Sequence, residues 1–122
     1  MESETDIMTQ KIIGCAYAVG NTLGHGFLEK VYENAMAYEL SKHGLHIHTQ
    51  LPIQVFYDGK VVGDYVADIC VESQVLVEIK AVQSLTNVHV AQCVNYLKAT
   101  GYVVCLLLNF GSPRVQVKRV VV

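Results

Sequence analysis

One acidic residue and one lysine interrupt an apolar segment in the second half of the sequence. Residues 74–82 read QVLVEIKAV, so Glu78 and Lys80 lie two residues apart among Val and Ile. Residues two apart in a β-strand point to the same face of the sheet. The pattern therefore predicts a strand that carries a carboxylate and an ammonium group on one face.

A second carboxylate joins this face if the chain turns back through residues 72–74. A turn of this length pairs Val71 with Val75, and counting outward then sets Asp68 directly opposite Glu78. Like charges at opposed positions destabilise a sheet, so the two carboxylates need a compensating cation. Lys80 is one candidate for that cation and a divalent metal ion is the other.

The chemistry that this cluster could support is that of a hard metal ion. Two carboxylates and the backbone carbonyl of Ile79 would supply the oxygen ligands that Mg²⁺ or Mn²⁺ prefers. Lys80 could then orient or deprotonate a metal-bound water and offset charge on an attacked phosphoryl group. An ordinary Glu–Lys pair on an exposed sheet face is the alternative interpretation.

Two helical segments carry further polar groups. In a helix expected over residues 86–100, spacings of three and four form a polar stripe opposite the apolar face, at His89, Gln92 and Tyr96. Near the start of a helix expected over residues 27–43, Glu29 and Tyr32 share a face. The alternatives are a solvated helix face and a favourable charge at a helix N-terminus.

The elements that must position these residues follow from hydrophobic periodicity. A 3.6-residue period predicts helices over residues 6–23, 27–43 and 86–100, and segments rich in Val, Ile and Tyr predict strands over 47–57, 60–71, 74–82, 102–110 and 115–121. The first three strands are expected to form an antiparallel meander. The order ααβββαββ predicts an α/β or α+β fold.

Composition limits the class of protein. The 122 residues are 52% hydrophobic and 16% charged, without an internal repeat or linker, which predicts a single domain over residues 1–122. The four cysteines form no C-x-x-C pair, so we expect reduced thiols in the core. Neither a membrane-spanning segment nor a secretory leader is recognisable, which favours a cytoplasmic protein.

Charge and the end of the chain bear on partners. Nine Lys and Arg against eleven Asp and Glu give a formal charge of −2, which does not favour broad electrostatic binding to nucleic acid. The one dense basic cluster is Arg114, Lys118 and Arg119. The apolar strand that ends at residues 120–122 could pair with a second copy of the chain as a homodimer.

Three motifs in a fixed order resemble a known protein family over nearly the whole chain. Gly26, Glu29 and Tyr32 match the G-x-x-E-x-x-Y motif of the GxxExxY protein family, which belongs to the PD-(D/E)xK, restriction-endonuclease-like nuclease superfamily. The D…(D/E)-x-K core of that superfamily resembles Asp68 followed by residues 78–80, with Ala67 in place of the proline. The helix motif of the family resembles H-x-x-Q-x-x-x-Y at residues 89–96.

The resemblance implies a restriction-endonuclease-like core, in which helices flank a mixed five-stranded sheet. It implies that Asp68 and Glu78 hold Mg²⁺, with Mn²⁺ as a substitute, and that Lys80 assists the attacking water. Glu29 would be the helix acid that binds or orients the metal ion or its water.

The same resemblance implies roles toward the substrate. Gln92 and Tyr96 would line the site, and His89 and Tyr32 are further candidates for substrate binding. The expected function is a Mg²⁺-dependent nuclease that hydrolyses DNA or RNA. The alternatives are a catalytically silent nuclease-fold module that binds nucleic acid or a protein, and a hydrolase of small phosphate esters.

Overall fold

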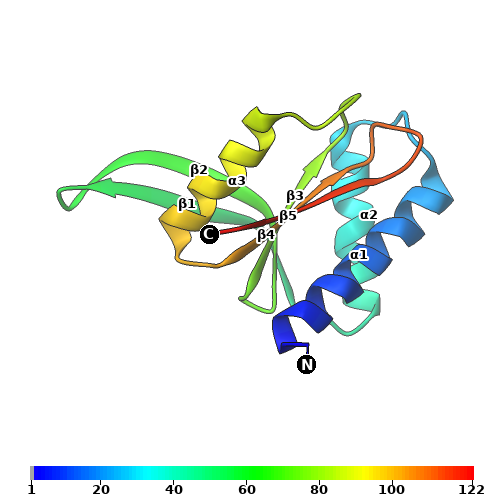
Figure 1. Cartoon of the computed structure of the whole chain (residues 1–122), viewed down its shortest axis with the longest axis horizontal. Helices are drawn as coiled ribbons and strands as arrows, with labels where there is room; N and C mark the ends of the chain where they lie inside the picture. The colour runs from blue at the N-terminus through cyan, green and yellow to red at the C-terminus, as the bar shows by residue number, and fades with distance from the viewer. Residues whose placement is uncertain (1) are drawn as a thin grey trace.

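The computed structural model describes residues 2–122, which form three helices and five strands (Figure 1). In chain order they are α1 (Glu4–Leu23), α2 (Glu29–Lys42), β1 (Ile47–Tyr57), β2 (Lys60–Val71), β3 (Val75–Lys80), α3 (Asn87–Thr100), β4 (Val104–Asn109) and β5 (Gln116–Val121). The expected order ααβββαββ is confirmed, and every expected end lies within two residues of the observed one.

The five strands form one mixed sheet in the order β1-β2-β3-β4-β5. Strands β3 and β4 are parallel and α3 connects them, whereas the other neighbouring pairs are antiparallel. Helices α1 and α2 cover one face of the sheet, and α3 lies on the other (Figure 1). The mixed sheet and the meander of β1, β2 and β3 agree with the expectations from the sequence.

Strand β3 lies at the centre of the sheet and contributes to two cores. Val75, Val77 and Ile79 pack against α1 and α2, whereas Leu76 packs against α3. Glu78 has the same strand parity as Leu76, so it lies on the α3 face, where the apolar series is interrupted. The centre of the sheet thus carries the charged motif on a strand that is otherwise buried on both sides.

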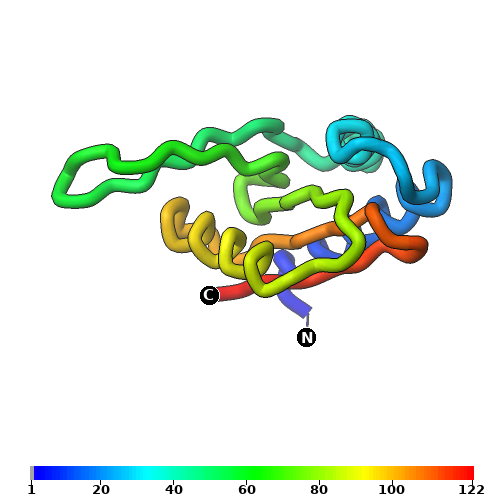
Figure 2. The backbone as a smooth tube through the Cα atoms, turned by 90° about the horizontal axis from the view of Figure 1, so that it is seen from above, coloured from blue at the N-terminus to red at the C-terminus, as the bar shows by residue number. Residues whose placement is uncertain are grey.

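Strands β1 and β2 continue past the body of the molecule as a projecting hairpin, called the arm (residues 51–67; Figure 2). At its tip, Asp58 and Gly59 form the turn, and both have positive φ, as a tight hairpin turn requires. The side chains of Tyr57 and Val62 are 75% and 63% exposed. The arm therefore offers apolar surface that the rest of the described chain leaves uncovered.

Two expectations about the chain can be compared with residues 2–122. All four cysteines are buried and free, as expected. None of the helices in this part of the chain combines the length and apolar character needed to cross a membrane.

Candidate functional site

The candidate site lies where the hydrogen-bonded ladder between β2 and β3 ends. The expected pairing of Val71 with Val75 is confirmed, and the ladder continues only as far as Ile69 and Val77. At the next position, the side-chain carboxylates of Asp68 and Glu78 act as hydrogen-bond acceptors in place of backbone carbonyls. The backbone N–H of Asp68 donates to Glu78 Oε1 (2.9 Å), and the backbone N–H of Ile79 donates to Asp68 Oδ2 (2.7 Å). Each acid thereby binds the backbone of the opposite strand.

Burial leaves the negative charge of these two acids without adequate compensation. Glu78 is 3% exposed, and its pKa is raised to about 8, first by burial and then by the charge of Asp68. The pKa of Asp68 is raised to about 6 by burial and by the charges of Glu33 and Glu29. Lys80 lowers both pKa values but is the weakest of the contributing causes. Of the two candidate cations, Lys80 alone therefore does not compensate the pair.

Lys80 is fixed by the backbone around it. As the last residue of β3 it pairs with Asn109 of β4, and its carbonyl accepts from the N–H of Phe110 (2.8 Å). The buried Asn109 side chain bonds both backbone groups of Val82, each at 2.9 Å. A Cβ at Gly111 would collide with the backbone of Val82, so this close approach requires glycine. No salt bridge within residues 2–122 engages the Lys80 ammonium group.

A further acid of the site, Glu33, is absent from the expectations. It lies on the buried face of α2 and is 5% exposed. Its Oε2 atom accepts from Lys30 Nζ and from Gln50 Nε2, both at 2.8 Å. Glu29, the expected helix acid, is exposed at the first position of α2, and its charge affects Asp68 less than that of Glu33 does. The sequence offers one signal for the burial of Glu33: its carboxylate lies on the same helix face as the apolar Met36 and Leu40.

Tyr32 supports the loop that enters α2. It is fully buried, and its hydroxyl donates to the carbonyl of Gly24 (2.7 Å) and accepts from the N–H of Phe27 (3.1 Å). Its ring stacks on Phe110 with centroids 4.9 Å apart. Within G-x-x-E-x-x-Y, the tyrosine thus anchors the loop before Glu29. Its side chain has no exposed surface for the substrate contact expected of it.

The expected polar stripe on α3 is wrong for Tyr96. Its side chain is 5% exposed and packs in the same core cluster as Leu97, because this helix face turns toward the sheet. The Tyr96 hydroxyl accepts from Gln92 Nε2 (3.0 Å), and its ring lies 5.7 Å from that of Tyr65. Burial and the charge of Glu78 raise the pKa of Tyr96 to about 12. Tyr96 is therefore close enough to Glu78 to feel its charge, and Gln92 is bound to the Tyr96 hydroxyl.

His89 begins α3. Its Nδ1 accepts from the backbone N–H of Thr86 (3.0 Å), which completes a capping box with the Thr86 side chain. The hydrogen bond with Thr86 explains why a histidine stands at this position, and no contact with a substrate is needed to explain it.

Two groups of side chains carry atoms of the kind that bind metal ions, and within residues 2–122 only the second group brings three such atoms within 4.8 Å of one another. Asp68, Glu78 and Glu33 offer only oxygen, which suits Mg²⁺ or Mn²⁺. The raised pKa values of Asp68 and Glu78 show that positive charge is missing around these two acids. A second group shares no residue with the expected site and lies between α1 and α2, with ligand atoms within 4.8 Å of one another: Cys15, Glu39 and His43. Glu39 of that group already pairs with Lys42 (3.0 Å).

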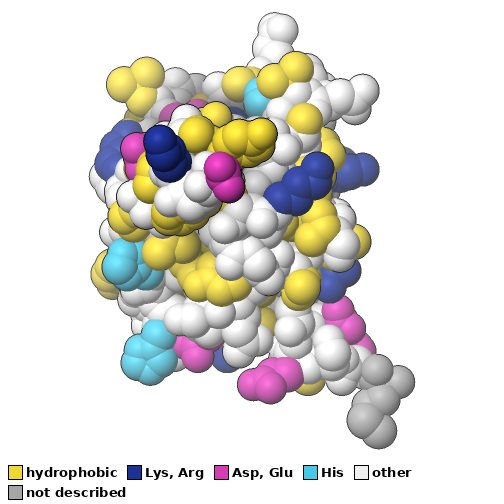
Figure 3. All heavy atoms as spheres, turned by 90° about the vertical axis from the view of Figure 1, so that its left-hand side faces the viewer, with side chains coloured by type: hydrophobic (Ala, Val, Ile, Leu, Met, Phe, Trp, Pro, Cys, Tyr) yellow, Lys and Arg dark blue, Asp and Glu magenta, His cyan; other side chains and the backbone are white. Residues whose placement is uncertain are grey.

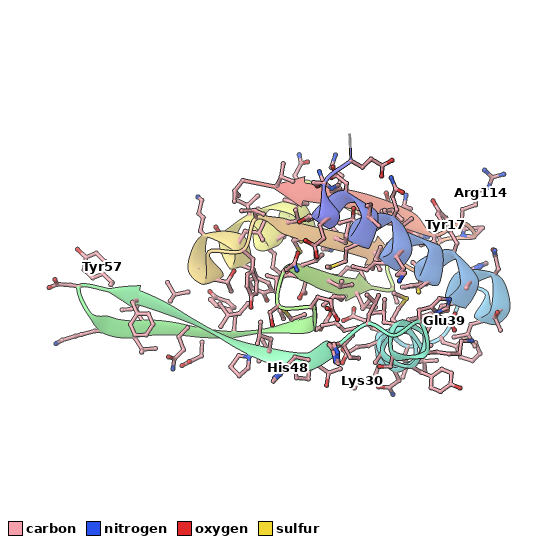
Figure 4. The ribbon with its side chains drawn as sticks, turned by 90° about the horizontal axis from the view of Figure 1, so that it is seen from below. Tyr17, Lys30, Glu39, His48, Tyr57 and Arg114 are labelled. Atoms are coloured by element: carbon pink, nitrogen blue, oxygen red, sulfur yellow. The ribbon has the colours of Figure 1, made fainter. Side chains whose placement is uncertain are left out.

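Basic side chains form no single patch beside the site. The expected cluster is divided, because Lys118 and Arg119 are neighbours on β5 and point to opposite faces, and Arg119 pairs with Asp6 (3.0 Å). Arg114 lines a separate cavity of about 290 Å³ beside Tyr17, far from Tyr57 at the tip of the arm (Figure 4). On the face that Figure 3 shows, basic, acidic and hydrophobic side chains are interspersed.

Comparison with solved structures supports the fold. The crystal structure of SSO0001 superposes with a TM-score of 0.63 and 18% sequence identity, over 94% of this chain and 58% of that one. The chain thus spans less than two thirds of the protein that it matches. No curated protein matches the sequence.

Comparison with protein families agrees with the geometry of the site. The sequence profile described as "PD-(D/E)XK nuclease superfamily" matches residues 6–120, which include both carboxylates of the pair and Lys80. The match spans nearly the whole chain and all of the sheet, so this protein belongs to the PD-(D/E)XK nuclease superfamily.

Proposed function

We propose that this protein is a divalent-metal-dependent phosphodiesterase that hydrolyses DNA or RNA. The observation that carries the proposal is the carboxylate pair at the end of the β2–β3 ladder. Asp68 and Glu78 are held by reciprocal backbone hydrogen bonds, yet burial leaves them without a sufficient cation, and Lys80 follows on the same strand face.

Asp68, Glu78 and Glu33 would hold Mg²⁺, with Mn²⁺ as a substitute, and Glu29 lies at the outer edge of the cluster. A bound ion of this kind supplies Lewis acidity and lowers the pKa of a coordinated water. Lys80 then orients the attacking water and offsets the charge that develops on the phosphoryl group.

The surroundings of the pair would hold the substrate. Gln92 and Tyr96 approach from α3 and line the site, while the capping role of His89 keeps the start of that helix in place. Tyr32 fixes the loop of the G-x-x-E-x-x-Y motif, which agrees with membership of the GxxExxY family.

We also propose that the protein forms a homodimer and resides in the cytoplasm. β5 is an edge strand, and Val121 and Val122 are 54% and 63% exposed, so a second copy could add to the sheet as a homodimer. Free buried thiols suit a reducing, cytoplasmic environment.

A second candidate function is a nuclease-fold module that binds nucleic acid or a protein without cleaving it. The formal charge of −2 favours it, as do the ion pairs that engage Lys30, Lys42 and Arg119 within residues 2–122. These pairs reduce the positive charge left for a polyanion.

Cleavage assays separate the candidates. Wild-type protein is incubated with Mg²⁺ or Mn²⁺ and single-stranded, duplex or branched DNA, RNA, or a small phosphate diester. Asp68→Asn tests the site, and Asp64→Asn is the matched control because Asp64 is an exposed acid on the same strand. Cleavage that only Asp68→Asn abolishes supports the proposal.

Other outcomes favour the alternatives. Nucleic-acid binding without cleavage by any variant favours the silent module, and turnover of the small diester alone favours a small-molecule hydrolase. Equal activity of wild type and Asp68→Asn contradicts the assignment of the site.

A further inference from the structure

Gln50 has a backbone conformation that a strand residue ordinarily avoids. Its φ is +56°, in the left-handed region, where the Cβ of an L-residue crowds the backbone. It lies inside β1, between Thr49, which pairs with Ile69, and Leu51, which pairs with Ala67. The register therefore places Gln50 opposite Asp68, where the β1–β2 pairing is interrupted.

Turn geometry does not explain this conformation. The other non-glycine residues with positive φ among residues 2–122 are Asp58, Glu72 and Ser73, and all three lie in the tight turns that join β1 to β2 and β2 to β3. Such turns require positive φ. Gln50 is the exception within a strand of the described chain, so its conformation has another cause.

The contact of its side chain indicates that cause. Gln50 Nε2 donates to Glu33 Oε2 at 2.8 Å, and Lys30 Nζ approaches the same oxygen at 2.8 Å. Gln50 itself is exposed, whereas the Glu33 side chain is almost completely buried. One residue at the base of the arm thus lies opposite one acid of the cluster and holds another by a hydrogen bond.

We infer that Gln50 is a positioning residue, whose left-handed backbone directs its amide to Glu33 and holds that carboxylate beside Asp68 for metal binding. The inference rests on the proposed metal-dependent function. Local strain of this kind persists where the surrounding structure enforces it, and it is concentrated at functional sites. Partners that orient a ligand change metal affinity by about 10- to 100-fold when they are removed.

The test separates strain from positioning with three variants. Gln50→Ala loses the amide and keeps the strain, whereas Gln50→Gly loses the amide and relieves the strain. Ser73→Gly is the matched control, because it relieves the same backbone strain at φ +53° in a turn remote from Glu33. Melting temperature and Mn²⁺ affinity by calorimetry are measured for each.

We expect Gln50→Gly to melt about 3 °C above Gln50→Ala. Both Gln50 variants should bind Mn²⁺ about tenfold more weakly than wild type. Ser73→Gly should keep wild-type affinity. Wild-type Mn²⁺ affinity in Gln50→Gly and Gln50→Ala contradicts the inference, because the residue is then only a structural kink.

Failure of the proposed function is distinguishable from failure of this inference. If wild-type protein binds no Mn²⁺, the metal-dependent function fails, and the crystal structure of metal-free Gln50→Gly tests the positioning role. A Glu33 carboxylate that has turned away from Asp68 supports that role. A carboxylate in its original position contradicts it.

Discussion

Strand β3 has two neighbours, and it pairs with them in different ways. Its parallel ladder with β4 runs along the whole strand, from Val75 and Val104 to Lys80 and Asn109. Its antiparallel ladder with β2 ends after three pairs, at Ile69 and Val77. We call the β4 side of β3 its regular edge and the β2 side its open edge. The regular edge holds the sheet together by backbone hydrogen bonds. At the open edge, two carboxylates take the place of those bonds.

The difference shows how a stable sheet can position reactive groups. At the open edge each acid accepts a backbone N–H of the opposite strand, so the N–H groups of Asp68 and Ile79 stay paired where the strands separate. The cost of burial appears instead in the raised pKa values of Asp68 and Glu78. A divalent cation would remove that cost, whereas the β4 edge needs no ligand.

The largest expected effect is loss of catalysis at the open edge. Lys80→Ala should lower cleavage by about 10²- to 10⁴-fold, because it removes the group that orients the water and offsets the phosphoryl charge. Melting temperature should change little, since no salt bridge within residues 2–122 engages Lys80. Lys60→Ala, at the exposed end of the arm, is the control. Unfolding of Lys80→Ala would favour a structural role.

The regular edge should respond in the opposite way. Leu106 pairs with Val77 and is fully buried on the face of α1 and α2. Leu106→Ala should lower the free energy of unfolding in urea by about 2 to 5 kcal/mol, because it leaves a cavity. Mn²⁺ affinity of the folded variant should equal that of wild type. A change in affinity would show that the two edges are coupled.

Glu78→Gln tests the cost of burying charge at the open edge. The pKa of Glu78 is raised from 4.5 to about 8, so the metal-free fold loses stability as pH rises through this range. The amide keeps the acceptor for the N–H of Asp68 but cannot ionise. At about pH 8 the metal-free variant should therefore be more stable than wild type, by of the order of 2 kcal/mol.

The check is urea unfolding without metal at about pH 4 and about pH 8, on either side of the titration. The stability difference between Glu78→Gln and wild type should vanish at the lower pH. An equal difference at both pH values would mean that packing, and not charge, distinguishes the variant.

The smallest expected effect concerns the α3 side. Tyr96→Phe removes the hydroxyl that accepts from Gln92 but keeps the buried ring. A hydrogen bond of this kind contributes about 1 kcal/mol, so cleavage should fall about fivefold. Steady-state assays with Gln92→Ala as the companion variant measure it. Full activity in both variants would remove this pair from the site.

What the sequence could predict depends on how local the information is. The register of Asp68 and Glu78 follows from a short turn and the two-residue period, and both are local. The elements and their order follow from periodicity for the same reason.

The remaining site residues depend on tertiary packing. Glu33 becomes a site acid only because α2 packs against the sheet near Asp68, and the positive φ of Gln50 leaves no trace in its residue type. The burial of Tyr96 depends on packing as well, because a polar stripe on one helix does not reveal which side of that helix meets the sheet. The capping role of His89, by contrast, could have been predicted, because His89 lies three residues after Thr86, the spacing of a capping box.

Titration of Mg²⁺ and Mn²⁺ into wild-type protein and the Asp68→Asn and Asp64→Asn variants, at about pH 6 and about pH 8, tests the central claim most directly. The open edge should bind a divalent ion more tightly at the higher pH, because Glu78 must lose a proton to become a ligand. Asp64→Asn should behave like wild type, and Asp68→Asn should lose binding. Absence of binding, or equal binding by all three proteins at both pH values, would contradict a metal site at this edge.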